Sequence, residues 1–81
     1  MNRRQELSAR ILDVLDGWDS PADEAVIHAQ VNARVNPDAL HSEFADALQF
    51  CEFYQFITGV RNPLHGTRWS ITDKGRAQRH A

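Results

Sequence analysis

The amino-acid sequence predicts one small α+β domain, in which three helices are followed by a C-terminal two-stranded β-hairpin. Three observations predict this class. Apolar residues recur at helical spacing before residue 55, strand-forming residues gather after it, and turn-forming residues separate these stretches. The length of 81 residues corresponds to one domain with a thin margin of stability, which a partner or a second copy would increase.

The first helix is predicted over about residues 3–16. Its apolar residues share one face: Leu7, Ile11, Val14, Leu15 and Trp18. Gly17 is expected to end this helix in the left-handed conformation that glycine adopts easily. Trp18 is expected either to fold back on the core or to lie over the next element.

The second helix is predicted over about residues 23–34, with Ile27 and Val31 facing inward. Its start has two alternatives. Ser20 is the N-cap and Pro21 the first helical residue, or residues 20–22 form a short extended piece before the helix. The Asn36–Pro37 pair ends the helix, because a residue before proline is disfavoured in the α conformation.

The third helix is predicted over about residues 40–54. Its buried stripe consists of Leu40, Phe44, Ala47, Leu48 and Cys51. After it, residues 56–61 and 68–72 are expected to form the strands of the hairpin, with Trp69 and Ile71 on one face and residues 62–67 as the loop. Thr72 is then placed to cap a last helical turn that extends to Gln78.

Two stretches carry a resemblance to a known class of domain. Residues 47–57 (ALQFCEFYQFI) resemble the end of the third helix and the first hairpin strand of winged helix-turn-helix domains. Residues 69–76 (WSITDKGR) resemble the second strand and its exit in many bacterial winged-helix regulators, where Leu/Ile-Thr-x-x-Gly-Arg follows an aromatic or aliphatic residue. The resemblance is to the superfamily and not to one family.

The resemblance implies a winged helix in which helix 40–54 enters a DNA major groove and the hairpin, or wing, contacts the backbone or the minor groove. The superfamily also includes RNA binders and protein-interaction modules, so the fold leaves the function open. One position departs from the pattern. Gln55 stands where the third helix often ends at glycine, so a tight exit costs about 1 kcal/mol more, or the exit is looser.

The charge distribution bears on DNA binding. The net charge is −2; residues 1–60 hold four basic and ten acidic residues, whereas residues 61–81 hold five basic residues and one acidic residue. No Lys or Arg lies between Val35 and Val60, so helix 40–54 offers nothing to neutralise phosphate. The sequence therefore favours DNA contact through the wing and the C-terminus, by Arg61, His65, Arg68, Lys74, Arg76 and Arg79. Alternatively these residues are a solvated basic terminus.

A protein partner is the second interpretation. Phe50 and Phe53 lie on the polar side of the third helix, and two aromatic rings on such a face are typical of a binding anchor. The surface for a protein partner or a second copy would comprise Glu43, Asp46, Gln49, Phe50 and Phe53. Alternatively the two rings close the core beneath the hairpin.

The sequence predicts no catalytic site, metal, cofactor or small-molecule substrate. Cys51 lies on the buried stripe, which indicates a core residue, and a single cysteine can form neither a disulfide within the chain nor a cysteine zinc site. The four histidines are scattered, and the glycines match no phosphate-binding pattern. Since no apolar segment resembles a signal peptide or a membrane span, we expect a soluble, cytoplasmic protein without a membrane partner.

Overall fold

The computed structural model describes residues 2–80. Within them the chain forms four helices and one antiparallel three-stranded sheet, which confirms the α+β class. The elements are α1 (Arg3–Asp16), β1 (Ala22–Asp23), α2 (Glu24–Asn32), α3 (His41–Phe53), β2 (Ile57–Asn62), β3 (Gly66–Ile71) and α4 (Asp73–Arg79). The sequence predicted two strands and a final helical turn; β1 adds a third strand, and α4 is a helix of seven residues.

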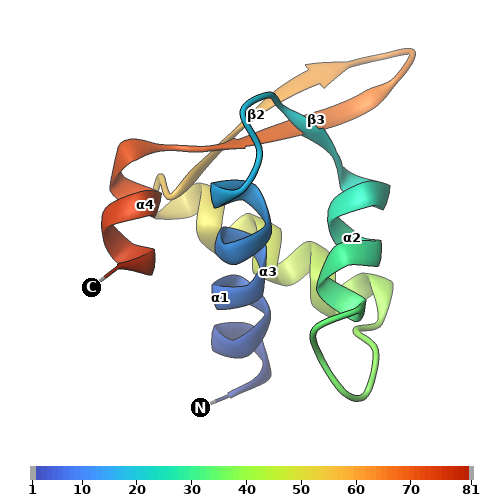
Figure 1. Ribbon diagram of the computed structural model, residues 1–81. Helices are drawn as coiled ribbons and strands as arrows, with labels where there is room; N and C mark the ends of the chain where they lie inside the picture. Colours follow the sequence, from blue (N-terminus) through green and yellow to red (C-terminus); the bar gives the residue numbers. More distant parts are fainter. Residues whose placement is uncertain (1, 81) are drawn as a thin grey trace.

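The helices form a bundle that the sheet covers at one end (Figure 1). α1 packs against α2, α3 and α4, and α3 crosses behind it in the view of Figure 1. The strand order is β1-β3-β2, and the β2–β3 hairpin projects past the start of α2 (Figure 1). α4 lies on the side of α1 away from α2, so the hairpin tip and α4 are at opposite ends of the sheet (Figure 1).

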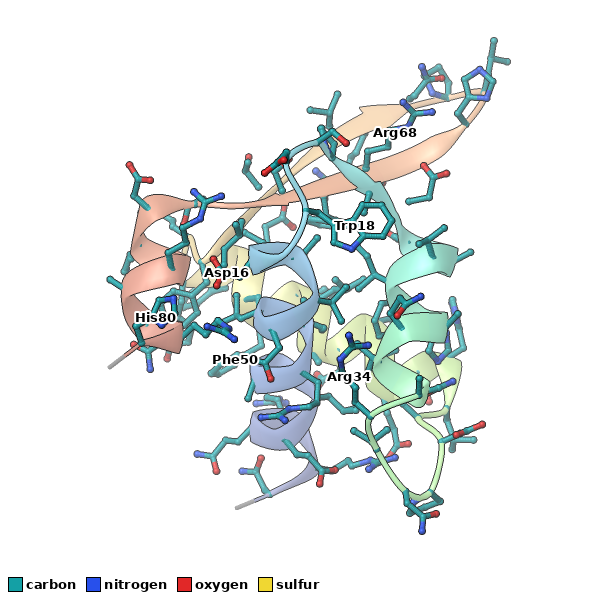
Figure 2. All side chains as sticks on the ribbon, in the orientation of Figure 1. Asp16, Trp18, Arg34, Phe50, Arg68 and His80 are labelled. Carbon is teal, nitrogen blue, oxygen red and sulfur yellow. The ribbon has the colours of Figure 1, made fainter. Side chains whose placement is uncertain are left out.

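α1 begins and ends through local hydrogen bonds. Asn2 caps its start, since its side-chain oxygen accepts from the backbone N–H of Gln5 at 2.8 Å. Gly17 ends it as predicted, but the predicted left-handed conformation is wrong, because φ of Gly17 is −85°. The last turn tightens instead: the N–H groups of Gly17 and Trp18 donate to the carbonyls of Val14 and Leu15. Trp18 stays partly exposed over the start of the next element (Figure 2).

The start of α2 follows the extended alternative. Ala22 and Asp23 form β1 and pair with Trp69 and Arg68 of β3, so an N-cap at Ser20 is wrong. Asp23 is the N-cap residue by backbone geometry, but its side chain makes no capping bond. Its carboxylate instead accepts from the Arg68 guanidinium at 3.1 Å.

The exit of α3 is tight. Gln55 has φ of 63°, the left-handed conformation that glycine adopts most easily. This geometry lets the N–H of Phe56 donate to the carbonyl of Cys51 at 2.9 Å, which closes the helix end. The tight form of the exit is therefore confirmed; its conformational cost, about 1 kcal/mol for a residue other than glycine, stays a prediction.

The hairpin loop is shorter than predicted. Pairing continues to Asn62 and Gly66, so residues 63–65 alone connect the strands and the predicted six-residue loop is wrong. The side-chain oxygen of Asn62 accepts from the N–H groups of Leu64 and His65, and Gly66 takes φ of 78°. A turn closed by an asparagine side chain, followed by a glycine with positive φ, is typical of a three-residue hairpin connection.

The core lies between the sheet and the three longer helices. Trp69 and Ile71 are buried on one face of β3, as predicted. Cys51 is fully buried, which confirms it as a core residue, and burial raises the pKa of its thiol from 9.0 to about 11. Across residues 2–80, no helix is both long enough and apolar enough to cross a membrane.

Candidate functional site

The two hairpin arginines are paired with acidic side chains. Arg61 contacts the carboxylate of Glu52 on α3 at 3.2 Å, and Arg68 contacts Asp23 on β1 at 3.1 Å. All four side chains are at least one-third exposed, so each pair stabilises the fold by about 1 kcal/mol or less. In each pair, a neighbouring carboxylate nevertheless balances the positive charge of the hairpin arginine.

The arginines of α4 face α1 and not the outer side of the hairpin. Arg76 contacts Asp16 at 3.3 Å, and Arg79 contacts both Asp13 at 2.8 Å and Asp16 at 3.1 Å. His80 also approaches Asp16, as Figure 2 shows. These contacts attach α4 to α1, so Arg76 and Arg79 are not brought together with Arg61 and Arg68.

Two basic candidates have no carboxylate within ion-pair distance among residues 2–80: His65 and Lys74. His65 lies in the exposed hairpin connection, and Lys74 lies over the ring of Phe56 at 5.6 Å. The hairpin tip, which carries His65, and α4, which carries Lys74, are at opposite ends of the sheet (Figure 1). The six residues that the sequence suggested for nucleic acid therefore occupy two separate regions, most of them already paired.

An aromatic cluster lies where α3 ends and β2 begins. We call Phe50, Phe53, Tyr54 and Phe56 the aromatic ridge. Tyr54 is at its centre, with ring centroids 4.9 Å from Phe50, 5.1 Å from Phe53 and 5.8 Å from Phe56. Phe50 and Phe56 pack against the core, whereas Phe53 is 80% exposed and Tyr54 is 45% exposed. Phe50 therefore closes the core in part, as one interpretation of the sequence expected. Phe53 is exposed, as the other interpretation, a binding anchor, expected.

Two hollows flank the aromatic ridge. The first hollow, about 530 Å³, lies between α1, the end of α3 and α4. Its apolar walls include Ala9 and Leu12 of α1, and Phe50 is visible between α1 and α4 in Figure 2. The second hollow, about 400 Å³, is more open and lies on the Phe53 side. Phe50 and Tyr54 line both hollows and so separate them.

The polar residues predicted for a protein interface are divided by the structure. Asp46 and Gln49 line the second hollow beside Phe53. Asp46 accepts two hydrogen bonds from Arg4, at 2.7 and 3.2 Å, and this contact raises the pKa of the Arg4 guanidinium. Glu43 is nearer the start of α3, where it accepts from the backbone N–H of Leu40 at 2.9 Å and so stabilises the helix start.

The sequence pattern predicted neither hollow. It also did not indicate that Tyr54 belongs to the candidate protein-binding surface. Tyr54 could have been suspected from its position beside Phe53, but the first hollow depends on where α4 docks. In the described part of the chain, no group of three or more His, Cys, Asp or Glu residues is arranged to hold a metal ion.

Comparison with models of known protein families, with curated proteins and with solved structures found no match to this chain.

Proposed function

We propose that this chain is a winged-helix protein-interaction domain that binds its partner through the aromatic ridge. The order of three helices and a hairpin, followed by a short helix, supports the winged-helix assignment. The single observation that supports the interaction role is the 80% exposure of Phe53 at the edge of a hollowed aromatic surface. A large ring so exposed on a small domain is typical of an interface anchor.

Magnitudes favour this surface over the hairpin. Covering an exposed phenylalanine ring stabilises a complex by about 2 kcal/mol. A phosphate that contacts Arg61 or Arg68 must instead displace Glu52 or Asp23, each of which repels it. Besides Glu52, α3 carries two further carboxylates, Glu43 and Asp46, and no Lys or Arg of its own, which disfavours nucleic acid but not a protein partner.

The test uses the photo-crosslinking residue p-benzoylphenylalanine in place of Phe53, in cells that produce the chain. We expect an adduct of defined mass that disappears when Tyr54→Ser is added, because both rings form the contact. The same probe at Ala29, exposed on α2, is the matched control and should give no adduct. Equal adducts from positions 53 and 29, or none from position 53, would refute the proposal.

Wing-led DNA binding is the second candidate, favoured by one observation: the hairpin projects beyond the bundle with Arg61 and Arg68 on its strands (Figure 1). Their exposed ion pairs are weak enough to exchange for phosphate contacts. Fluorescence anisotropy with labelled duplex DNA at about 50 and 200 mM salt tests it. Binding at the lower salt that is lost on Arg61→Ala and Arg68→Ala would favour the DNA function, and no binding would exclude it for this domain.

A further inference from the structure

We infer that the end of α4 is a strap that rising salt releases from α1, while the start of α4 stays anchored. We call residues 76–80 the strap. Its release is independent of the proposed function. The consequence for partner binding rests on that function, because the strap forms one wall of the first hollow beside the aromatic ridge.

The strap is attached to α1 by charge and not by apolar burial. Across residues 73–80, all of which the structure describes, only Gly75 is buried, and it precedes the strap. Arg76 and Arg79 instead contact Asp13 and Asp16 of α1 at 2.8, 3.1 and 3.3 Å, on the side where His80 also approaches α1 (Figure 2). Since salt screens such partly exposed ion pairs but not apolar contacts, the attachment should weaken as ionic strength rises.

The two carboxylates lie where α1 itself disfavours them. Asp13 and Asp16 are in the last turn of α1, and the sequence of that turn contains no Lys or Arg. Negative charge near a helix C-terminus is unfavourable, because the free carbonyl groups there already carry partial negative charge. The guanidinium groups of the strap offset this local cost, so the acidic pair favours the contact with α4 and not the stability of α1 alone.

The strap can leave α1 without isolating all of its charges. Arg10 lies 3.2 Å from Asp13 on α1, and Asp73 lies 3.7 Å from Arg76 on α4, each three positions away on its own helix. These local partners remain when the strap lifts, so the open state keeps part of the charge pairing. A helix of seven residues is marginal in water by itself, so the strap should unwind as it lifts.

The start of α4 is attached by contacts of another kind. The Thr72 hydroxyl accepts from the N–H of Gly75 at 3.0 Å and donates to the carbonyl of Gln55 at 2.6 Å. Gly75 also lies directly against the backbone of Phe56. None of these groups carries a net charge, so salt screens the contacts little. The boundary between the anchored and the releasable part of α4 therefore lies after Gly75.

Release of the strap opens the first hollow. Gln78 and Arg79 are its α4 wall, and Ala9 and Leu12 belong to its α1 wall. A partner that covers the aromatic ridge and enters this hollow would lose the contacts with α4 when the strap lifts. Rising ionic strength should therefore weaken partner binding through the strap.

Amide hydrogen exchange followed by NMR at about 50 mM and about 1 M NaCl tests the release. The amides of residues 77–79 should exchange at least about fivefold faster at the higher salt, the size expected when weak ion pairs are lost. The amide of Leu48 in α3, a core position, reports on unfolding of the whole domain and should not change. Strap amides that exchange equally at both salts overturn the inference, and so does an equal acceleration at Leu48.

A pair of variants tests the cause of the release. Asp13→Asn combined with Asp16→Asn should exchange fast at residues 77–79 at both salts, because no carboxylate remains for the strap. Asp23→Asn is the matched control, since it removes the exposed pair with Arg68 and leaves α1 and α4 unchanged. Its strap should respond to salt as in the wild-type chain. A double variant that keeps the wild-type salt response overturns the inference.

The crosslinking probe at position 53 separates the strap from the proposed function. A weaker adduct in the double variant than in Asp23→Asn supports both. A released strap without any adduct supports the strap and refutes the proposed function, whereas an adduct from a chain whose strap ignores salt does the reverse. A released strap with equal adducts in both variants overturns the consequence for binding.

Discussion

Gly75→Ala is expected to destabilise the domain, because α4 starts in close contact with the backbone after α3. A Cβ atom at Gly75 would overlap the carbonyl oxygen of Phe56 and lie 2.9 Å from a side-chain carbon of Ile71. Heavy atoms in ordinary contact are about 3.5 Å apart, so α4 or the Phe56 carbonyl must move by more than about 1 Å. The contact with Phe56 involves backbone, which cannot rotate away as a flexible side chain can.

The magnitude follows from what this movement breaks. The N–H of Thr72 donates to the Phe56 carbonyl at 3.0 Å, and the Thr72 hydroxyl donates to the carbonyls of Gln55 and Phe56. Loss of these two donors costs about 2 kcal/mol, and overpacking costs about 1–3 kcal/mol more. The higher helix propensity of alanine returns about 1 kcal/mol. The net loss is about 2–4 kcal/mol, which lowers the Tm of a domain of this size by at least about 8 °C.

Thermal unfolding followed by circular dichroism measures the effect, with Gly17→Ala as the matched control. A Cβ at Gly17 would meet only the Val14 carbonyl oxygen, at an ordinary 3.6 Å, and φ of −85° suits alanine. This control should melt at or slightly above the wild-type temperature. If Gly75→Ala melts as high as Gly17→Ala, the Gly75–Phe56 contact does not fix the position of α4.

Three further predictions concern the end of α3 and the core. Gln55→Gly should raise the free energy of unfolding by about 1 kcal/mol in urea titrations, because φ of 63° strains any residue other than glycine. Gln55→Ala is the control and should bring no such gain. An equal gain from both variants would contradict the reasoning. The buried Ser8 hydroxyl has no hydrogen-bond partner of good geometry among residues 2–80 and lies beside the Cys51 thiol, a weak partner, so Ser8→Ala should leave the free energy of unfolding unchanged or raise it by up to about 1 kcal/mol; a destabilised variant would contradict this. The pKa of Cys51 is about 11 in the folded chain and 9.0 unfolded. The thiol is therefore mostly neutral in both states below about pH 8, and between about pH 9 and 11 it is ionised mainly in the unfolded chain. The free energy of unfolding should therefore fall by about 2 kcal/mol at about pH 10.5 relative to pH 8, a fall that Cys51→Ala should lack; equal pH dependence in both chains would contradict it.

The helices could be predicted because burial imposes their period on the sequence. Leu7, Ile11 and Leu15 recur on one face of α1, and Phe44, Leu48 and Cys51 do so on α3, and all six are buried. The placement of Leu40 in the same buried stripe is wrong, because Leu40 precedes the first turn of α3 and is 66% exposed. β1 could not be predicted with the same certainty. Two residues carry no period, and they form a strand only because Trp69 and Arg68, more than forty positions later, pair with them.

The hairpin connection shows why strand ends were less accurate than helix faces. Residue type alone predicts a loop for Asn62, Gly66 and the proline between them. In the structure Asn62 and Gly66 are paired, and their turn-forming properties serve the three residues they enclose. Residue type thus indicated a turn, whereas its length depended on the pairing register, which no local pattern contains.

For the candidate site, the sequence identified the aromatic residues but not their exposure. Phe53 is the last residue of α3, so its direction depends on whether the helix continues to that point or unwinds before it. The tight exit at Gln55 preserves the helix and turns Phe53 outward. The basic C-terminus was equally ambiguous, because Arg79 meets Asp13 across 66 positions and only the folded chain brings them together.

The docking of α4 links stability to recognition. Gln78 and Arg79 of α4 form one wall of the first hollow, and the same Arg79 holds α4 to Asp13 of α1. The close approach at Gly75 positions the start of that helix. A change that loosens α4 therefore removes a wall of the hollow as well as contributions to the fold, so Gly75→Ala should weaken partner binding and unfold more easily. Phe53→Ser should weaken binding alone, because an 80% exposed ring contributes little to the isolated domain. Tm and association should therefore be measured in parallel for these two variants. Weaker binding of both supports a preformed hollow, whereas unchanged binding of Phe53→Ser would show that the exposed ring has no role in binding.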